Sequence, residues 1–204
     1  ADIKYGEKGT TFTAYEKGKR LGVFRTILKG ECNVKNALAV IAVARALKIG
    51  TADIKKGFNS FVGIARRDEI LGKINGATVV ADYAHHPTQL RERINDYKET
   101  AKGRLVVVFQ PHTYSRTALL FEDFVNVLKD CKNLYVFRTY AAREKFSEEG
   151  SALRLCKALP ESLFFVKFEE LYARLVRDVM PTDTVLILGA GDLYDNVKNV
   201  LKPL

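Results

Sequence analysis

The order of apolar and polar positions divides the chain near residue 62. Residues 10–28 alternate apolar and polar side chains on both sides of the sequence EKGK, which predicts a β-hairpin. Residues 32–50 then carry apolar side chains at helical spacing among alanines, and Gly50 gives this segment its end. We expect a helix buried on most sides, with the apolar positions Val34, Leu38, Ile41 and Leu47. A hairpin and one or two helices are too little for a core of their own, so residues 1–62 are expected to be the end of a larger domain.

From residue 63 onward, apolar runs alternate with loops and amphipathic helical segments. The apolar runs cover residues 77–84, 104–110, 133–140, 162–168 and 183–190. The helical segment 118–130 carries one apolar stripe, formed by Leu120, Phe121, Phe124, Val125 and Leu128. Strands that alternate with amphipathic helices predict an α/β fold, with a Rossmann-like, mostly parallel open sheet and helices on both faces. We expect this fold to occupy residues 63–204, after the hairpin-plus-helix remnant.

Polar side chains follow the apolar runs at the points where the strands are expected to end. The chain has three histidines; His85 and His86 follow one run and His112 follows the next. Because the carboxyl ends of parallel strands meet at one edge of a sheet, and ligands bind there, this placement predicts a polar site. The same edge should receive Arg143, Glu144 and the turn GAGD at residues 189–192.

The turn after residue 84 is fixed by a proline. The residue before Pro87 avoids helical dihedral angles, and proline itself suits the first position of a helix. We therefore expect Asp82, Tyr83 and His85 to project from a rigid turn into the site.

Several motifs are compatible with more than one interpretation. Adjacent His85 and His86 point apart, and no second histidine or cysteine has zinc-ligand spacing, so we predict no metal site. The GAGD turn lacks the third glycine and the later acidic residue of a dinucleotide fingerprint, which favours a tight turn in which Asp192 caps the final helix. Segment 61–70, FVGIARRDEI, is either a charged link between two domains or, through its two arginines, a phosphate-binding segment. No phosphate-loop sequence G-x-x-x-x-G-K-[ST] occurs.

Composition narrows the classes of function. The net charge of +9 is spread along the chain without a nucleic-acid-binding motif, so we expect a solvated surface that attracts anionic small substrates, and no nucleic-acid partner. No apolar run is long enough to span a membrane, and the first residues lack an apolar signal core, which predicts a cytoplasmic protein without a membrane partner. Three widely spaced cysteines without a CxxC pair indicate reduced, buried thiols.

Six motifs in order resemble the carboxyl-terminal half of the Mur ligases, from about residue 8 to the end. They are GECNVKNALAVIAVARAL, FVGIARRDEILG, VVADYAHHPT, RLVVVFQPHTYSRT, LYVFRTYAARE and LILGAGDL. The resemblance implies that residues 1–62 end a central ATP-binding domain and that residues 63–204 form the carboxyl-terminal domain. It implies ATP-dependent amide-bond formation with Mg²⁺, most similar to the members that join L-alanine to UDP-N-acetylmuramate in peptidoglycan synthesis. Since the family's phosphate loop and most of its magnesium ligands have no counterpart here, we expect this portion to be inactive alone.

The resemblance also implies residue roles. For L-alanine it implies a site of His85, with a catalytic role, together with His112, Tyr83 and Arg116, whose guanidinium would bind the carboxylate. For ATP it implies contacts from Asn36, Asp82, Tyr83 and an arginine of the pair Arg66 and Arg67. The alternative for the carboxylate-binding arginine is a surface pair with Glu122 or Asp123.

Two departures and two alternatives qualify the resemblance. Cys32 stands where many relatives have histidine, and Thr113 stands where some have arginine, which leaves Arg116 as the sole arginine of its loop. One alternative is the ligase that attaches a tripeptide to the same sugar nucleotide, and the other is a non-catalytic binding domain that kept the fold. If residues 1–62 stand without the rest of their domain, a homodimer is one way to cover their apolar faces.

Overall fold

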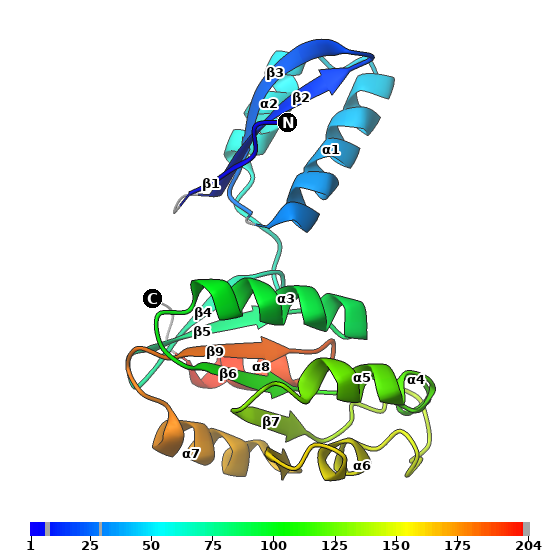
Figure 1. Ribbon diagram of the computed structural model, residues 1–204, viewed down its shortest axis with the longest axis vertical. Helices are drawn as coiled ribbons and strands as arrows, with labels where there is room; N and C mark the ends of the chain where they lie inside the picture. The colour runs from blue at the N-terminus through cyan, green and yellow to red at the C-terminus, as the bar shows by residue number, and fades with distance from the viewer. Residues whose placement is uncertain (7–8, 29, 202–204) are drawn as a thin grey trace. The chain divides into compact units, whose positions relative to one another are not determined.

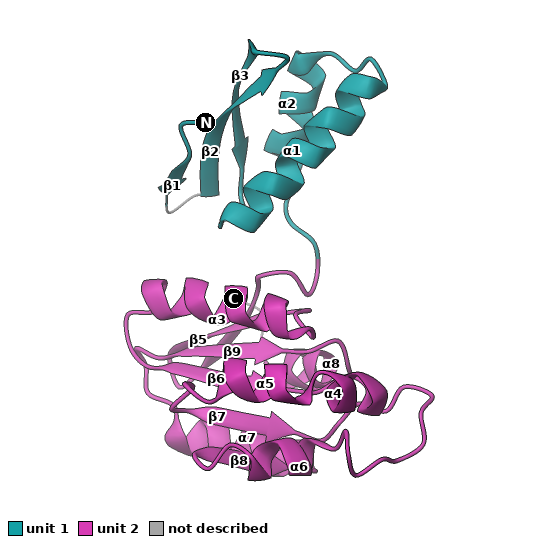
Figure 2. Ribbon diagram, turned by 45° about the vertical axis from the view of Figure 1, so that its right-hand side comes forward, with its two compact units in different colours: residues 1–64 teal, residues 65–204 magenta. Residues whose placement is uncertain are grey.

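The computed structural model describes residues 1–6, 9–28 and 30–201 (Figure 1). The chain forms two compact units, Ala1–Ile64 and Ala65–Leu204, which are coloured separately in Figure 2. We call them unit 1 and unit 2 and describe each by itself.

Unit 1 is a small antiparallel sheet with two helices against it. The sheet has the order β1-β2-β3, with β1 at Lys4–Gly6, β2 at Gly9–Glu16 and β3 at Lys19–Thr26. Helix α1 spans Glu31–Ala46 and α2 spans Thr51–Ser60. The predicted hairpin is confirmed, because Glu16 pairs with Lys19 across its turn. The core of this unit is built from Phe12, Ala14, Phe24, Val34, Ala37, Ile41 and Ile54.

The expectation that residues 32–50 form a helix buried on most sides is wrong for this unit. Helix α1 buries only one stripe against the hairpin, and Leu38, which was expected inside, is 42% exposed. Val43 on the same helix and Leu47, which directly follows it, are 61% and 69% exposed. An apolar helix sequence indicates that the helix is buried, but it does not indicate which segment covers it. The described residues of unit 1 provide no second layer over the face of α1 that points away from the hairpin.

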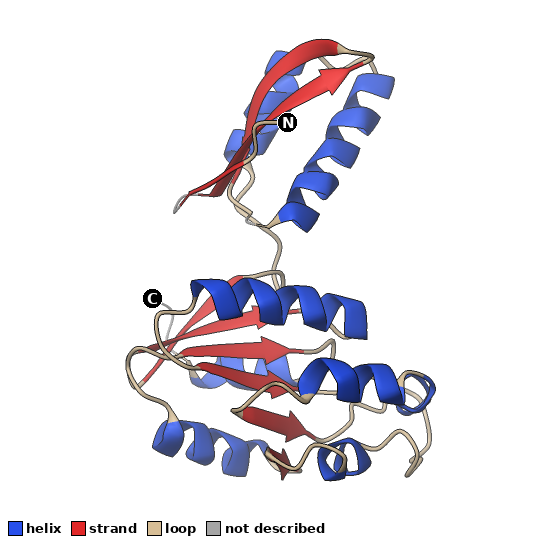
Figure 3. Cartoon of the chain, viewed as in Figure 1, coloured by secondary structure: helices blue, strands red, loops and turns tan. Residues whose placement is uncertain are grey.

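Unit 2 contains a six-stranded sheet. Helices lie on both faces of this sheet (Figure 3). The strand order is β4-β5-β9-β6-β7-β8, and the strands span Glu69–Ile74, Ala77–Asp82, Thr184–Leu188, Leu105–Phe109, Leu134–Phe137 and Ser162–Phe165 in that order. Helices α3, α5 and α6 cover one face and α7 and α8 the other; they span Pro87–Thr100, Phe121–Leu128, Ala152–Lys157, Phe168–Asp178 and Leu193–Val200. A further short helix, α4, spans Tyr114–Leu119. The predicted α/β, mostly parallel architecture is confirmed.

One strand was not predicted. Residues 69–74, of which only 69 and 70 belong to the segment 61–70 with its two open interpretations, form β4 and pair antiparallel with β5. The connecting residues Asn75 and Gly76 both have positive φ, as a two-residue hairpin turn requires. The Asn-Gly pair was the sequence signal for this hairpin.

Smaller departures concern helix bounds and cysteines. The helical segment predicted at 118–130 begins at Tyr114 and is divided at Leu120 into α4 and α5. The sequence GDLYDNVKNVLK at residues 191–202 predicts the last helix, which is α8; residue 202 itself lies outside the described residues. All three cysteines are free, but only Cys131 is buried: Cys156 is partly exposed, and Cys32 is exposed because it lies on the uncovered helix of unit 1. Among the described helices, none has the length and apolar character needed to cross a bilayer.

Candidate functional site

Two histidine rings meet at the carboxyl edge of the sheet in unit 2. His85 follows β5 and His112 follows β6, and β9 lies between these strands. The ring centroids of His85 and His112 are 5.9 Å apart, and Tyr83 packs edge-on against His85 at 5.3 Å. His86 does not join them, because its Nδ1 accepts the backbone N–H of Thr88 and caps α3. The predicted meeting of the strand ends therefore holds for two of the three histidines.

His85 is held in one tautomer by its own turn. Its Nδ1 lies 2.8 Å from the carbonyl oxygen of Tyr83, which can only accept, so Nδ1 carries the proton. Burial lowers the pKa of His85, and the positive charge of Arg116 acts in the same direction. The ring is therefore neutral at pH 7, with Nε2 left as an unprotonated acceptor.

His112 has the opposite tautomer. Nη1 of Arg116 lies 3.1 Å from Nδ1 of His112 and also donates to the backbone carbonyl oxygen of His112. A guanidinium can only donate, so Nδ1 of His112 accepts and Nε2 carries the proton. Burial lowers the pKa of His112, with Arg116 as the next cause. The expected alternative, a pair between Arg116 and Glu122 or Asp123, is absent among the described residues.

The loop after β7 contacts the turn that carries His112. The ring of Tyr140 stacks on His112 with centroids 5.3 Å apart, and its backbone N–H donates to Pro111 at 2.9 Å. Glu144 of the same loop accepts hydrogen bonds from the hydroxyls of Thr113 and Ser115, and from the backbone N–H of Ser115 at 2.8 Å. The sequence placed Glu144 at this edge but gave it no role, and Tyr140 was missed.

The carboxylate of Asp82 accepts hydrogen bonds from two different turns. One oxygen of its buried carboxylate, which is 7% exposed, accepts the N–H of Ala84 at 2.9 Å, and the other accepts that of Asp68 at 3.0 Å. Burial raises the pKa of the Asp82 carboxyl, against the influence of Arg93 and these N–H groups. Each carboxylate oxygen keeps a second lone pair, so one hydroxyl could still be bound.

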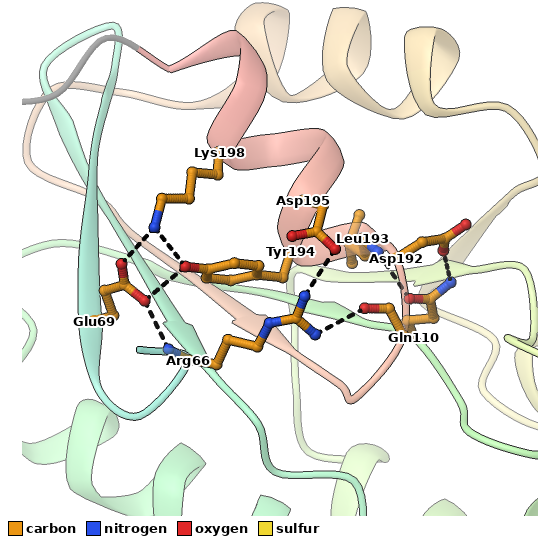
Figure 4. A network of polar contacts seen from close by, with 9 residues as sticks. Arg66, Glu69, Gln110, Asp192, Leu193, Tyr194, Asp195 and Lys198 are labelled. Atoms are coloured by element: carbon orange, nitrogen blue, oxygen red, sulfur yellow. Dashed lines mark hydrogen bonds and ion pairs between the residues drawn. The ribbon is translucent and has the colours of Figure 1, made fainter. Parts of the chain in front are cut away.

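The two adjacent arginines have different surroundings. Arg66 belongs to a polar network (Figure 4): its guanidinium pairs with Asp195 at 2.7 Å and lies over the ring of Tyr194. Its backbone N–H donates to Glu69, which also accepts from Tyr194. By contrast, the half-exposed side chain of Arg67 lies over the Tyr83 ring, 5.2 Å from its centroid.

The two arginines therefore differ in whether their guanidinium groups are already paired. Both belong to unit 2 and not to a free link. Of the two, only Arg67 offers a guanidinium without a close ion pair, since its nearest carboxylate oxygen, on Asp82, is 4.0 Å away.

The GAGD turn packs on Gln110, and the expected cap of the final helix comes from elsewhere. Asp192 is the residue before α8, but its side chain makes no cap hydrogen bond. It accepts from Gln110 at 2.7 Å and from Arg138. The fully buried Gln110 accepts the N–H of Leu193 at 3.0 Å through its side-chain oxygen and so replaces the predicted cap. A Cβ on residue 191 would lie 2.4 Å from that oxygen of Gln110. Close packing against Gln110 therefore explains why a glycine stands at this position.

Two further expectations concern the adenine contact and a metal site. Asn36 is on α1 of unit 1, where its side-chain amide donates to Asn33 at 3.4 Å. The described residues contain no group of three or more His, Cys, Asp or Glu side chains that could hold a metal ion.

Comparisons with known proteins identify the family of this chain. A family model described as "Mur ligase, glutamate ligase domain" matches residues 66–191, which is most of unit 2. The chain belongs to the Mur ligase family. The resemblance inferred from the six sequence motifs is thereby confirmed.

Individual relatives are similar over nearly the whole chain. The UDP-N-acetylmuramate--L-alanine ligase of Lachnospira eligens is 36% identical over 99% of the chain and 45% of its own length. That of Geobacter sp. (strain M21) is 40% identical over 95% of the chain and 43% of its own length. The crystal structure of the UDP-N-acetylmuramate-alanine ligase of Thermotoga maritima has a TM-score of 0.74, with 26% identity over 97% of the chain and 43% of that protein. The chain thus spans less than half the length of these relatives.

Proposed function

We propose that this chain is the carboxyl-terminal portion of an ATP-dependent ligase that joins L-alanine to UDP-N-acetylmuramate. One observation carries the proposal: His85 and His112 hold opposite tautomers beside Arg116, at the sheet edge where ligands bind. Relatives named for this reaction, at 36% and 40% identity, support the choice of substrates.

The three side chains match the groups of an amino acid. A carboxylate accepts hydrogen bonds, and the remaining N–H groups of Arg116, with Nε2–H of His112, can donate them. An α-ammonium has no lone pair and must lose a proton before it can attack. Unprotonated Nε2 of His85 can accept that proton, which makes His85 the catalytic base and Tyr83 its positioning partner.

The nucleotide side of the site is formed by Arg67, Asp82 and Tyr83 in this proposal. ATP supplies the phosphoryl group that makes the sugar carboxylate reactive. The half-exposed Arg67 would bind its phosphates, and a free lone pair of Asp82 would accept a ribose hydroxyl. Arg66 is assigned to the network in Figure 4 instead, and Asn36 to the adenine. Mg²⁺ is assigned to the complete ligase, with at most part of its ligands from this chain, because the described residues contain no group of three or more His, Cys, Asp or Glu side chains that could hold it.

Unit 1 is proposed to be the end of the central ATP-binding domain. The support is the uncovered apolar face of α1, where Val43 and Leu47 are exposed. The rest of that domain would cover this face, and a homodimer of the isolated chain is the alternative cover.

The test is amino-acid-dependent phosphate release by the complete ligase with ATP, Mg²⁺ and UDP-N-acetylmuramate. L-Alanine should support release, His85→Gln should reduce it, and the 204-residue chain alone should give none, because it has no phosphate-loop sequence. Release with the tripeptide but not with L-alanine would show the recycling ligase instead. Release with neither would contradict a ligase and favour a binding domain.

A further inference from the structure

The loop of residues 138–151 contacts the 111–116 turn at several points. Tyr140 holds the beginning of the turn, through its backbone bond to Pro111 and its stacking on His112. Glu144 holds the middle of the turn with three hydrogen bonds. Farther along the loop, a Cβ on Gly150 would approach the carbonyl oxygen of Tyr114 to 1.9 Å, so the two backbones are in direct contact.

The carboxylate of Glu144 occupies a position that few other groups could fill. One oxygen accepts both hydroxyls, from Thr113 and Ser115, while the other accepts the backbone N–H of Ser115. A carboxylate has four lone-pair directions and no proton, so it can satisfy three donors at once. The hydroxyl of Ser115, then that of Thr113 and the Ser115 N–H, lower the pKa of Glu144 to about 2, so it is ionised throughout the neutral range.

The 111–116 turn determines the positions of His112 and Arg116, the groups proposed to bind the amino acid. Arg116 is one residue after Ser115 and donates to both the ring and the carbonyl oxygen of His112. The carbonyl oxygen of Thr113 accepts the backbone N–H and the hydroxyl of Thr117, which continues α4. If the turn shifted, the guanidinium and Nε2–H of His112 would move together.

We propose that Glu144 is a positioning residue for amino-acid binding: it fixes the Thr113–Ser115 turn and thereby the places of His112 and Arg116. The inference rests on the proposed function and adds a residue from outside the binding cluster. Glu144 makes no hydrogen bond with His112 or Arg116, so it positions them through the turn, and its negative charge also acts on the pKa of His112 in the upward direction.

The experiment compares Glu144→Ala, Glu144→Gln and the control Glu148→Ala in the complete ligase. Glu148 lies in the same loop, is exposed, and its carboxylate has no hydrogen bond or ion pair among the described residues. Glu144→Ala should raise the KM for L-alanine at least tenfold and leave the KM for ATP within twofold. Glu144→Gln, which keeps one side-chain oxygen as an acceptor in place of two, should give a smaller rise. Glu148→Ala should change neither constant.

A merely structural role would give a different result. Loss of folded protein lowers the apparent kcat and the melting temperature while both KM values stay unchanged, and that pattern would overturn the inference. The inference would also be overturned if the Glu144→Ala protein had the melting temperature of the parent and a KM for alanine within threefold of the parent value. If Glu144→Ala does not fold, Glu144→Gln is judged by the same criteria.

A double variant separates action through the turn from direct contact with the substrate. If Glu144 acts through Ser115, then Ser115→Ala combined with Glu144→Ala should raise the KM for alanine no more than Glu144→Ala alone. Independent, multiplying effects would contradict the inference. The parent ligase is assayed first: if it uses another amino acid or the tripeptide, the proposed function fails, and the Glu144 variants are then tested with that substrate.

Discussion

The guanidinium of Arg116 donates to Nδ1 of His112 across 3.1 Å, and this contact determines which nitrogen of the ring carries its proton. His85, 5.9 Å away between ring centroids, has its proton on the opposite nitrogen because Nδ1 faces a carbonyl oxygen. One ring therefore presents a donor and its neighbour an acceptor. An amino acid, which has one anionic and one cationic group, needs this pairing of donor and acceptor.

This relationship predicts distinct NMR signatures for the two rings in the chain itself. Long-range ¹H–¹⁵N spectra at pH 7.5 should show His85 as the Nδ1–H tautomer and His112 as the Nε2–H tautomer. Both rings should titrate below the usual midpoint of about 6.5 because burial lowers both pKa values. Removing the charge with Arg116→Gln should raise both midpoints. Identical tautomers in the two rings would contradict the assignment.

The same pKa shifts predict the pH dependence of stability and activity. The pKa of each histidine is lower in the folded state than in the unfolded state, where it is about 6.5. Such a histidine makes its full contribution to stability when the pH is above the unfolded-state pKa. That contribution is lost as pH falls from about 6.5 through the lower folded pKa. The kcat/KM for alanine should fall over the same acid range, since protonated His85 cannot accept a proton. A plateau of kcat/KM from pH 7.5 down to pH 5 would show that neither histidine takes part.

Arg116 should determine amino-acid affinity. In the complete ligase, Arg116→Ala removes a charge-assisted contact and should cost about 2 to 4 kcal/mol of alanine recognition. Arg116→Lys should restore only part, because an ammonium cannot reproduce the planar fork, and the KM for ATP should stay unchanged. Steady-state kinetics decide: if kcat/KM for alanine stays within about threefold of the parent, roughly 0.7 kcal/mol, another group binds the carboxylate.

Arg66 and Arg67 should respond oppositely to the same substitution. Arg67→Ala should raise the KM for ATP about tenfold in the complete ligase, as expected for loss of about 1.4 kcal/mol of phosphate binding, without lowering the melting temperature. Arg66→Ala loses the pair with Asp195 and the contact with the Tyr194 ring, and should lower the free energy of unfolding of the chain by about 1 kcal/mol. A reversal of these two results would move the nucleotide contact to Arg66.

The alternation of apolar runs and helices was enough to predict the sheet and the edge where its polar residues meet. A short continuous apolar run followed by a helix of period 3.6 is a local pattern, and the parallel arrangement then brings His85 and His112 together. Strand β4 was missed because it lies outside this repeat, although Asn75-Gly76 marked its turn. The cap of α8 was also missed, since Gln110 lies 83 residues away from Leu193 and no local pattern reports such a contact.

The exposed face of α1 should distinguish the isolated chain from the complete ligase. Val43→Glu should change the stability of the chain by no more than about 0.5 kcal/mol, because Val43 is 61% exposed. The same change should lower the melting temperature of the complete ligase, where the charge would be buried. As a control, Ile41→Ala should cost about 2 to 4 kcal/mol in both, since Ile41 is 3% exposed. Equal tolerance of Val43→Glu in both proteins would show that this face is free.

Hydrogen exchange in the chain provides an independent test of unit 1. Amides of residues 9–60 should exchange faster than those of β5, β6 and β9, because the smaller unit lacks a covering layer. Uniform protection, together with a doubled mass by light scattering, would show that a second copy of the chain covers α1.

Gly191 should connect the GAGD turn to amino-acid binding. In Gly191→Ala the new Cβ would lie 2.4 Å from the side-chain oxygen of Gln110 and 2.7 Å from Cβ of Tyr140, so at least one of them must move. Displacing Gln110 removes the cap of α8, and displacing Tyr140 moves the ring that stacks on His112. We expect a loss of about 1 to 3 kcal/mol of stability and a higher KM for alanine in the complete ligase. Gly57→Ala, whose Cβ meets nothing within 4 Å in a helix, should not destabilise the chain. Parent-like melting and an unchanged alanine KM in Gly191→Ala would show that the turn tolerates a side chain and is independent of the site.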